Sequence, residues 1–403
     1  MDKATFYSTV GRDAVRLLAD AQPTPCYLYF KQLLRQRVSE LMGCLPASFQ
    51  VHYAIKANPH QGLLQELASL GIGADVASLG ELLKARASGM PPKLIEFSGP
   101  GKTEEELAEA IKQGVSSINA EGLSEVESLA RISRRLGIKA NVGLRINPRR
   151  STQAAGMQMS GDTQFGMAVE LAAEALRFIK QQPDTLLFTG IHAHSGSQML
   201  SAAGVLQNFR AILDVALEIS RWNILPIGKI NFGGGWGIKY FSNQSSLDLK
   251  HLSEGLHELF DDPSCADLSR VRRIIEPGRF LVGECGLYVT TVLYRKPGVE
   301  REFLIVDGGM HQNYLLAGGM GQVIRRNFEM DAIPRNPESD RAGAAYDIAG
   351  CLCTPQDILA TNFQSEREIQ KGDRIVFFNA GAYGLTASPT SFLSHSPPGE
   401  HLI

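Results

Sequence analysis

FQVHYAIKANPHQGLLQELASLGIGADVASLGELLKARASG, residues 49–89, is the stretch that decides the fold. An apolar run of strand length at 49–57 is followed by helical periodicity over 60–70, and the same pair recurs at 72–78 and 79–89. Apolar strands that alternate with helical segments are typical of parallel βαβ units, because two parallel strands need a crossover between them. The stretch therefore predicts a parallel α/β architecture.

The same alternation continues to residue 278 and gives eight candidate strands. They are FQVHYAIKA (49–57), IGADVAS (72–78), KLIEFSG (93–99), SSINAE (116–121), NVGLRINP (141–148), LFTGIHAHSGS (187–197), KINFGGG (229–235) and RRIIEPG (272–278). Seven helical stretches separate them, at 60–70, 79–89, 103–113, 123–136, 168–181, 202–221 and 246–261. Eight strands with crossover helices predict a closed (β/α)8 barrel over residues 31–280. A Rossmann-like open sheet is the alternative that the alternation alone leaves open.

After residue 280 the pattern changes to β-structure. GLYVTTVLYRK, REFLIVDGG, YDIAGCLC and DRIVFFNAG are typical of strands, with little helical sequence between them. We therefore expect a second, β-rich domain of sandwich-like or barrel-like form. It would comprise residues 281–403 together with residues 1–30, which contain a short candidate strand around 25–30.

The composition favours a soluble globular protein. The 403 residues are 44% hydrophobic and 20% charged, with a formal net charge of −2, which does not suggest a nucleic-acid-binding face. The N-terminal MDKATFYSTV lacks the pattern of a signal peptide, and no apolar window of about 18 residues suggests a membrane span. We therefore expect a cytoplasmic protein with neither a nucleic-acid nor a membrane partner.

The six cysteines are scattered, at 26, 44, 265, 285, 351 and 353, and do not indicate a disulfide framework in a chain of this length. Cys351 and Cys353 are too close together for the CxxC spacing of zinc sites, and no second pair follows. The sequence therefore predicts no metal site.

Functional side chains of a barrel gather at the C-terminal ends of its strands. Those ends carry charged, reactive or glycyl residues where a stabilising core would have Val and Ile: Lys56, Asp75, Ser98, Arg145, His192, His194, Gly233–Gly235, Glu276 and Arg279. Lys56 is a candidate for Schiff-base chemistry, because burial in a barrel mouth favours the neutral, nucleophilic amine. A lysine that reaches out to solvent is the alternative.

The glycine run Gly233-Gly234-Gly235 follows the seventh strand. Unshielded backbone N–H groups can cradle a phosphate, and the loops after strands seven and eight are a recurrent phosphate site in barrels. Arg279 would supply a positive charge beside this loop. We therefore expect a phosphate site here, although the spacing is not GxGxxG and a glycine loop without this role is the alternative.

Glu276 and the two histidines complete the predicted barrel mouth. Glu276 is suited to keep a pyridine nitrogen protonated, and a salt bridge to Arg279 is the alternative. His192 and His194 alternate on one strand and could ligate a metal, but no third ligand follows at nearby spacing. One imidazole stacked on a cofactor ring and one satisfied core histidine explain them equally well.

Taken in order, these residues resemble the fold-type III pyridoxal-5′-phosphate decarboxylases, the group of diaminopimelate, ornithine and arginine decarboxylases. The resemblance runs from about residue 25 to residue 398. Its motifs are Tyr-Ala-Ile-Lys-Ala-Asn (53–58), Asp-Val-Ala-Ser-Leu-Gly-Glu (75–81), Phe-Ser-Gly-Pro-Gly-Lys (97–102), Arg-Ile-Asn-Pro (145–148), Gln-Phe-Gly-Met (164–167), His-Ser-Gly-Ser-Gln (194–198), Gly-Gly-Gly (233–235), Glu-Pro-Gly-Arg (276–279), Cys353 and Gly-Ala-Tyr (381–383).

The resemblance implies a role for each of these residues in a pyridoxal phosphate site. Lys56 would form the Schiff base, His194 would stack on the ring, and Glu276 would face the ring nitrogen. The phosphate would be bound by Ser197, Gly235, Arg279 and Tyr383, within loops that also contain Gly233, Gly234 and Gly278. Asp75 and Arg145 would support the site. Cys353 would protonate the substrate carbon after CO2 leaves, reaching the cofactor from the other subunit of a homodimer with shared active sites.

One departure from the family pattern concerns the substrate. After the catalytic cysteine, the diaminopimelate, ornithine and arginine enzymes carry an acidic residue that meets the distal amine, whereas this chain has Thr354. Asp357 is a candidate to compensate, which keeps a free basic amino acid as an alternative substrate. Cys-Thr-Pro (353–355) with the segments around Tyr383 and Phe392 is more similar to a biosynthetic branch that includes the butirosin-pathway glutamyl-[acyl-carrier-protein] decarboxylase and exosortase-associated decarboxylases. Conjugated or carrier-tethered amino acids are therefore expected.

Two other functions compete with decarboxylation. An amino-acid racemase on a related barrel would use a tyrosine base and would gain nothing from Cys353. A non-catalytic regulator with this fold would be expected to have lost Lys56 or Cys353, and both are present.

Overall fold

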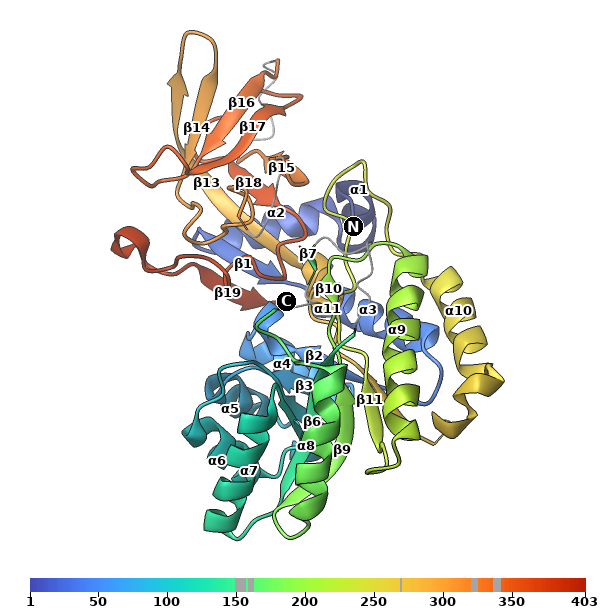
Figure 1. Cartoon of the computed structure of the whole chain (residues 1–403). Coiled ribbons are helices and arrows are strands. Elements are labelled where there is room, and N and C mark those ends of the chain that lie inside the picture. Colours follow the sequence, from blue (N-terminus) through green and yellow to red (C-terminus); the bar gives the residue numbers. More distant parts are fainter. Residues whose placement is uncertain (149–156, 159–162, 269, 320–324, 336–341) are drawn as a thin grey trace. The chain divides into compact units, whose positions relative to one another are not determined.

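The computed structural model describes residues 1–148, 157–158, 163–268, 270–319, 325–335 and 342–403 (Figure 1). These residues form two compact units. One comprises residues 36–237 and 247–280, and the other comprises residues 1–35, 238–246 and 281–403. Residues 31–35 and 238–246 group with the second unit, whereas the sequence predicted a barrel over residues 31–280.

The first unit is a closed barrel of eight parallel strands, as the sequence predicted. The strands are β2 (Phe49–Ala54), β3 (Gly73–Val76), β4 (Ile95–Phe97), β5 (Ser117–Ala120), β6 (Ala140–Asn147), β9 (Leu186–His192), β11 (Lys229–Asn231) and β12 (Arg272–Ile275). Each of these strands pairs with the next one in this list, and the last strand, β12, pairs with the first, β2, which closes the ring. Because the ring has no open edge, the Rossmann-like alternative is wrong.

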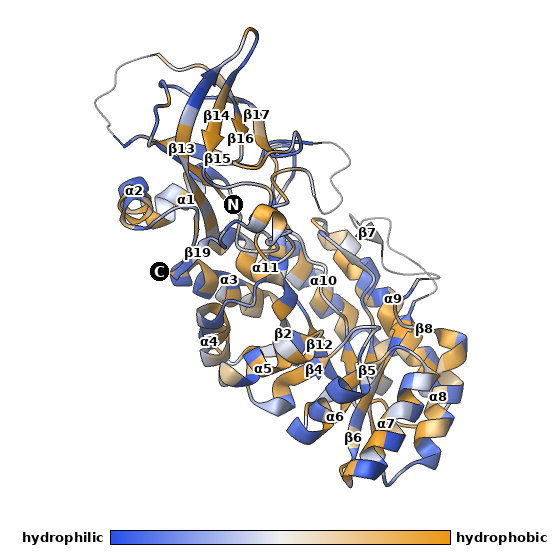
Figure 2. Cartoon of the chain, turned by 90° about the vertical axis from the view of Figure 1, so that its left-hand side faces the viewer, coloured by the Kyte–Doolittle hydropathy of each residue, from blue (hydrophilic) through white to orange (hydrophobic). Residues whose placement is uncertain are grey.

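The crossover helices match the seven predicted stretches closely. They are α4 (Gln61–Ser69), α5 (Leu79–Ala87), α6 (Glu104–Gln113), α7 (Leu123–Leu136), α8 (Val169–Gln181), α9 (Ala202–Arg221) and α10 (Leu249–Asp261). Helix α6 begins with a capping box in which Thr103 and Glu106 satisfy each other's backbone N–H groups. Helices such as α7 and α8 carry both apolar and polar stretches in Figure 2, as expected when one side of a helix covers a sheet.

Three helices near the N-terminus were not predicted. They are α1 (Lys3–Val10), α2 (Arg12–Ala21) and α3 (Lys31–Cys44). Helix α3 precedes the first barrel strand, so a count of crossovers between strands leaves it out. Short elements complete the barrel unit: η1 (Ile55–Ala57), η2 (Pro92–Leu94), η3 (Pro263–Leu268), β7 (Met157–Gln158), β8 (Met167–Ala168) and β10 (Gly196–Ser197).

The second unit is a mixed β-sheet domain. Its strands follow the order β15 (Met330–Ile333), β18 (Arg374–Phe377), β13 (Gly286–Pro297), β14 (Glu302–Val306), β16 (Ala345–Ala349) and β17 (Ile358–Gln364). The predicted N-terminal strand is β1 (Cys26–Tyr29), which pairs with β13 and with β19 (Gly399–Leu402). Residues from both ends of the chain therefore join this sheet, as expected for the segment around residue 25. Short helical turns are α11 (Arg279–Val282), η4 (Gly283–Cys285) and η5 (Phe392–Ser394).

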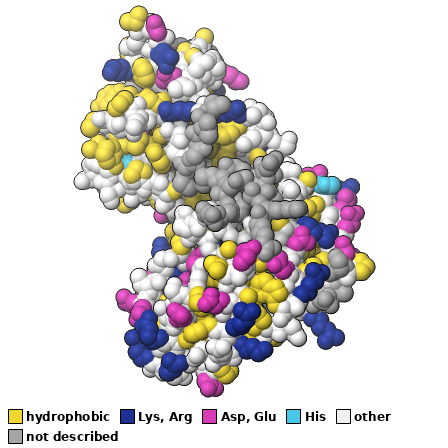
Figure 3. All heavy atoms as spheres, in the orientation of Figure 1, with side chains coloured by type: hydrophobic (Ala, Val, Ile, Leu, Met, Phe, Trp, Pro, Cys, Tyr) yellow, Lys and Arg dark blue, Asp and Glu magenta, His cyan; other side chains and the backbone are white. Residues whose placement is uncertain are grey.

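The described surface mixes both signs of charge. Figure 3 shows Lys and Arg side chains interspersed with Asp and Glu on the visible face of the barrel unit. Among the described residues, no helix has the length and apolar character needed to cross a membrane.

Candidate active site

The strands of the barrel bring the predicted site residues to one end. Asp75 pairs with Ala54 across β3 and β2, directly before the turn η1 that carries Lys56. Arg145 pairs with His192 across β6 and β9, and His192 pairs with Asn231 of β11. Glu276 follows β12 directly. Because the strands are parallel, their C-terminal ends share one rim.

Lys56 differs from the expectation in one respect. Its amine was expected to be buried, but the side chain is exposed, because the chain turns into η1 at the rim of the barrel. Its positive charge still acts on the residues below it. Lys56 lowers the pKa of Asp75 and of Glu276, in each case against a larger opposing effect of burial. Lys56 is thus an exposed cation whose charge acts on two buried acids, Asp75 and Glu276.

Glu276 is held in place by two neutral neighbours. Asn231 Nδ2 donates to Glu276 Oε1 over 2.6 Å, and His192 Nε2 lies 3.0 Å from Glu276 Oε2. Burial, together with the charge of Glu96, raises the pKa of Glu276 to about 7. These two contacts orient the carboxylate.

Asp75 is a second buried acid beside Glu276. Burial and the charge of Glu276 raise its pKa to about 7. Its Oδ1 atom is buried and has no hydrogen-bond partner among the described residues. A buried carboxylate oxygen without a partner is costly. Asp75 and Glu276 therefore form a pair of acids to which a cation or an N–H donor would bind favourably.

The two histidines have separate roles, and neither belongs to a metal-ligating cluster of the described residues. Burial lowers the pKa of His192 to about 3, so its ring is neutral, and Nε2 can donate to Glu276. His194 Nδ1 accepts the backbone N–H of Gly234 over 3.1 Å. The neutral His194 ring therefore carries its proton on Nε2. His192 is bonded to Glu276 through Nε2, whereas its buried Nδ1 has no hydrogen-bond partner among the described residues. The half-buried His194 remains available to cover a flat ligand.

The glycine loop offers fewer free N–H groups than the sequence suggested. Gly233 N donates to Asn231 Oδ1 over 2.9 Å, and Gly234 N donates to His194. Two of the three amides are therefore already satisfied within the fold. The N–H of Gly235 has no acceptor among the described residues; its φ is 89°, and a Cβ at this position would clash with Gly196 O, so the position requires glycine. Gly235 is thus the glycine of this loop that can bind an anion.

Three further predicted residues lie in segments that approach this loop, since Cβ atoms at Gly235 and Gly234 would meet Gly196 O and Glu276 O. Ser197 lies in β10, half-buried, and its hydroxyl makes no side-chain hydrogen bond to the described residues. Gly278 packs so closely on β2 that a Cβ there would lie 3.0 Å from that of Ala57 and 3.2 Å from Ala54 O. Arg279, half-buried, begins α11 directly after Gly278.

Arg145 is anchored by a residue that was not predicted. Its guanidinium donates to Glu121 Oε1 over 2.8 Å and lies 4.8 Å from the centre of the Phe165 ring. Glu121 also accepts the backbone N–H groups of Gly99 and Gly166. The ion pair is therefore part of the structure of the rim. Glu121 directly follows β5 and could have been found by its position at a strand end.

Asn231 is the second missed residue. It lies in the barrel interior and connects Glu276 with a deeper polar cluster through a 2.8 Å hydrogen bond from Nδ2 to Glu96 Oε2. Asn119 Nδ2 also donates to Glu96, and Lys229 forms an ion pair with it. Burial opposes ionisation of Glu96, but Lys229 and His52 outweigh it and lower its pKa to about 2. Lys229 and Asn231 alternate on β11, and this polar pattern in an interior strand was the available signal.

The remaining predicted residues lie in the β-rich unit. Cys353 is exposed and Thr354 half-buried, in the turn after β16. Asp357 is buried, and its two oxygens accept the N–H groups of Met310 and Leu352 over 2.6 and 2.8 Å. Tyr383 is half-buried and has a positive φ of 59°, which is uncommon for a non-glycine residue.

Comparison with known proteins identifies the family. The family model of the pyridoxal-binding domain of pyridoxal-dependent decarboxylases matches residues 31–283. The chain belongs to this family.

The similarity of this decarboxylase to its relatives extends over nearly the whole chain. The L-glutamyl-[BtrI acyl-carrier protein] decarboxylase of Niallia circulans is 34% identical over 387 residues, which cover 94% of this chain and 88% of that protein. The diaminopimelate decarboxylase of Aquifex aeolicus is 30% identical over 380 residues, covering 93% and 86%. The structure of diaminopimelate decarboxylase from Helicobacter pylori with L-lysine has a TM-score of 0.84 at 26% identity and covers 96% of this chain and 94% of that one.

These findings establish a pyridoxal-phosphate-dependent amino-acid decarboxylase with a (β/α)8 barrel and a separate β-rich domain. They favour decarboxylation over the racemase and regulator alternatives.

The residues of the barrel rim fit pyridoxal phosphate. The unpartnered Asp75 Oδ1 and the raised pKa values of Asp75 and Glu276 suit a protonated ring nitrogen. The N–H of Gly235 and the hydroxyl of Ser197 suit a phosphate, and the exposed amine of Lys56 suits an aldehyde.

Proposed function

We propose that this decarboxylase acts on an amino acid whose distal end is conjugated, as in an acyl-carrier-protein thioester. Pyridoxal phosphate, when bound, supplies the electron sink that weakens the bond between the α-carbon and its carboxyl group. The protein residues hold the reacting groups, supply charge and deliver a proton. The substrate preference rests on the turn that contains Cys353.

The barrel residues would hold the cofactor. Lys56 would provide the amine that carries it, and Glu276, oriented by Asn231 and His192, would accept the ring N–H. His194 would cover the ring, with its tautomer set by the N–H of Gly234. The phosphate would be bound by the N–H of Gly235 and by the side chains of Ser197, Arg279 and Tyr383.

Cys353 would act as the acid. We propose that its thiol protonates the α-carbon after CO2 leaves, and that it does so from the partner subunit of a homodimer with shared active sites. The exposure of Cys353 supports this assignment, because a thiol that acts beyond its own fold must be accessible. General acid catalysis of this kind contributes about 10²–10⁴-fold to a rate.

The observation that carries the substrate proposal is the lack of an available carboxylate on the turn at 353–357, a segment that the structure describes throughout. Thr354 follows Cys353, and both oxygens of Asp357 are used by backbone N–H groups. Asp357 is therefore not suited to compensate for the missing acidic residue. A free diamino acid would bring a distal ammonium without a partner on this turn, which is costly when buried. A conjugated substrate has an uncharged distal end, and its carbonyl oxygen can accept a hydrogen bond from the hydroxyl of Thr354.

Carrier-tethered substrates are also supported by the similarity to the Niallia circulans enzyme, whose name specifies an acyl-carrier-protein-bound glutamyl group. The test compares kcat/KM for CO2 release from carrier-tethered glutamate with that from free glutamate, diaminopimelate, ornithine and lysine. We expect the tethered substrate to be preferred by the wild type. Thr354→Glu should shift kcat/KM toward the free diamino acids, whereas the size-matched Thr354→Val should not. Efficient turnover of a free diamino acid by the wild type would contradict the proposal.

A further inference from the structure

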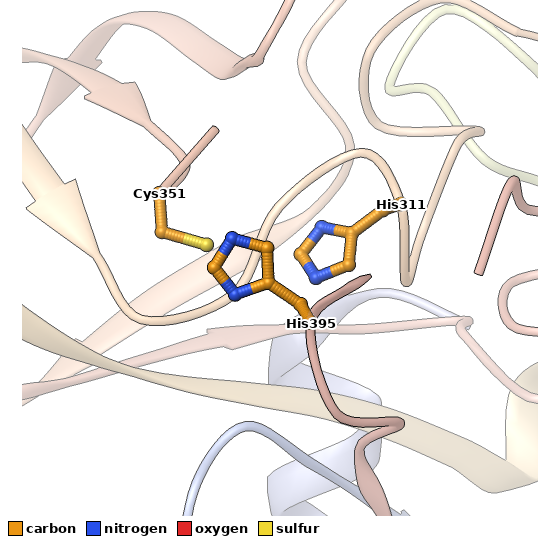
Figure 4. A group of neighbouring side chains, drawn as sticks. All are labelled: His311, Cys351 and His395. Carbon is orange, nitrogen blue, oxygen red and sulfur yellow. The ribbon is translucent and has the colours of Figure 1, made fainter. Parts of the chain in front are cut away.

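Three metal-ligating side chains meet in the β-rich unit, and none of them is assigned to cofactor or substrate. They are His311, Cys351 and His395, and one ligand atom of each lies within 4.8 Å of those of the other two (Figure 4). The rings of His311 and His395 are 5.0 Å apart. The three residues come from the loop after β14, the turn after β16 and the segment after η5. Because they are far apart in sequence, their spacing could not have revealed the cluster.

His311 provides an independent indication of a ligand. Its side chain is 1% exposed, and neither Nδ1 nor Nε2 has a hydrogen-bond partner among the described residues. A buried imidazole without any partner leaves at least one N–H and one lone pair unsatisfied, which costs about 1–3 kcal/mol per group. A bound metal ion would satisfy the ligand nitrogen of this ring.

The backbone around two of the ligands is fixed without any ion. Asp357 accepts the N–H of Met310, next to His311, and the N–H of Leu352, next to Cys351. Cys351 N also donates to Gly308 O over 3.0 Å. The two loops that carry His311 and Cys351 are therefore joined, and the negative charge of Asp357 lies close to both. Asp357 thus acquires a positioning role that its sequence position did not suggest.

The ligand set selects the kind of ion. Two imidazoles and a thiolate favour borderline-soft transition metals over Mg²⁺ or Ca²⁺, which prefer oxygen ligands. Around a tetrahedral zinc ion with bonds of about 2.0–2.3 Å, ligand atoms lie roughly 3.3–3.7 Å apart. The observed spacing of up to 4.8 Å therefore requires a shift of about one ångström. His395 is exposed and can make this movement by rotating its side chain.

We propose that His311, Cys351 and His395 bind one Zn²⁺ ion, with water as the fourth ligand. The ion would join three loops of the β-rich unit. It would also restrain the turn that contains Cys353, two residues from Cys351; this consequence for catalysis rests on the proposed function, whereas the metal site does not.

The test measures metal binding on the full-length, pyridoxal-phosphate-loaded protein, purified without a histidine tag. After removal of metal with a chelator, Zn²⁺ is added, and bound zinc is measured by mass spectrometry. Co²⁺ serves as a spectroscopic probe, because a cobalt–thiolate bond gives a charge-transfer absorption band that imidazole alone does not. Cys351→Ser, His311→Gln and His395→Ala are compared with two controls, Cys353→Ser and His251→Ala, which remove a neighbouring thiol and an exposed imidazole of the barrel.

We expect one zinc ion per chain in the wild type and in both controls. Each ligand variant should lose roughly 100-fold or more in zinc affinity, since even residues that only support a ligand contribute about 10–100-fold. Cys351→Ser should also lose the cobalt–thiolate band. His395→Ala keeps the test valid if the buried variants fail to fold, because His395 is exposed and the visible cofactor absorption reports an intact barrel.

Equal zinc affinity in the wild type and in His395→Ala, or the absence of stoichiometric zinc in the wild type, would overturn the proposal. Binding that is lost only in His251→Ala would indicate an adventitious ion. These readouts use no substrate, so a failure of the substrate proposal leaves them unchanged.

Discussion

Replacing Asn231 by alanine should damage both the fold of the barrel and its cofactor site. Asn231 is fully buried and makes three hydrogen bonds, to Glu96, to Glu276 and from the N–H of Gly233. The alanine variant leaves two carboxylates and one backbone N–H without these partners. Hydrogen bonds to charged groups contribute about 1.5–3 kcal/mol each, and an unsatisfied buried amide costs about 1–3 kcal/mol.

Water can enter the space left by the amide and recover part of this loss. We therefore expect the free energy of unfolding to fall by about 4 kcal/mol, near the lower end of the summed range. For a unit of this size, 4 kcal/mol corresponds to a decrease in Tm of about 8–16 °C. Pyridoxal phosphate should also bind at least about tenfold more weakly, because Glu276 loses the contact that orients it.

The assays are thermal unfolding of the cofactor-free protein and a titration with pyridoxal phosphate followed by visible absorption. The matched control is Asn141→Ala, which removes a single hydrogen bond of 2.8 Å to Val115 O from a half-buried asparagine of the same barrel. It should cost only about 1 kcal/mol and leave cofactor affinity unchanged. Asn231→Asp should be at least as harmful as Asn231→Ala, because it places a third carboxylate between two others. If Asn231→Ala is no less stable than Asn141→Ala and binds the cofactor normally, the reasoning is refuted.

Two further predictions concern the rim of the barrel. Lys56→Ala should abolish the visible absorption of lysine-bound pyridoxal phosphate and its capture by borohydride. The control Lys102→Ala, which removes a lysine from a neighbouring rim loop, should retain both. A normal absorption band in Lys56→Ala would exclude Lys56 as the attachment site. Burial raises the pKa of Glu276 from its ordinary value of 4.5 to about 7, so between these pH values the cofactor-free barrel holds a proton that the unfolded chain releases. The stability that this proton contributes is fully present below about pH 4.5 and is lost as the pH rises to about 7. Glu276→Gln should therefore lose less stability than the wild type between about pH 4.5 and 7, and parallel Tm profiles of the two proteins would contradict this assignment.

Much of the barrel could be predicted from the sequence because its signal is local. A strand buried on both faces is a short apolar run, and each crossover helix has an apolar stripe of period 3.6, so both can be recognised without knowing what they contact. The strands β15 and β19 were missed because each has only four residues and lacks a strong apolar run. The seven-residue strand β17 was missed because only Leu359 and Ala360 are buried and polar residues follow them. Helix α3 was missed because it lies outside the strand-to-strand alternation.

The candidate site was predictable as a set of residues but not as a set of contacts. Lys56, Asp75 and Glu276 stand out because charged residues at the ends of apolar strands need a reason to be there. The sequence could not show that Gly233 and Gly234 use their N–H groups within the fold, or that Asp357 is occupied by Met310 and Leu352. The contacts of Gly234 with His194 and of Met310 with Asp357 join loops that are far apart in the sequence, whereas those of Gly233 with Asn231 and of Leu352 with Asp357 are local and depend on the exact shape of a turn.

The sequence by itself therefore determined the order of strands and helices, the parallel pairing, and the residues available at the strand ends, because these follow from periodicity and from the geometry of crossovers. The pairing of β5 with β6 and of β12 with β2, which closes the barrel and excludes an open sheet, is seen only in the tertiary structure. Only the tertiary structure decided which atoms meet. It places Asn231 between two buried carboxylates, leaves Asp75 Oδ1 without a partner among the described residues, and brings His311, Cys351 and His395 together. The physical reason is that hydrogen bonds and metal coordination act over about 2–3 Å. Such distances depend on how elements remote in sequence pack against one another.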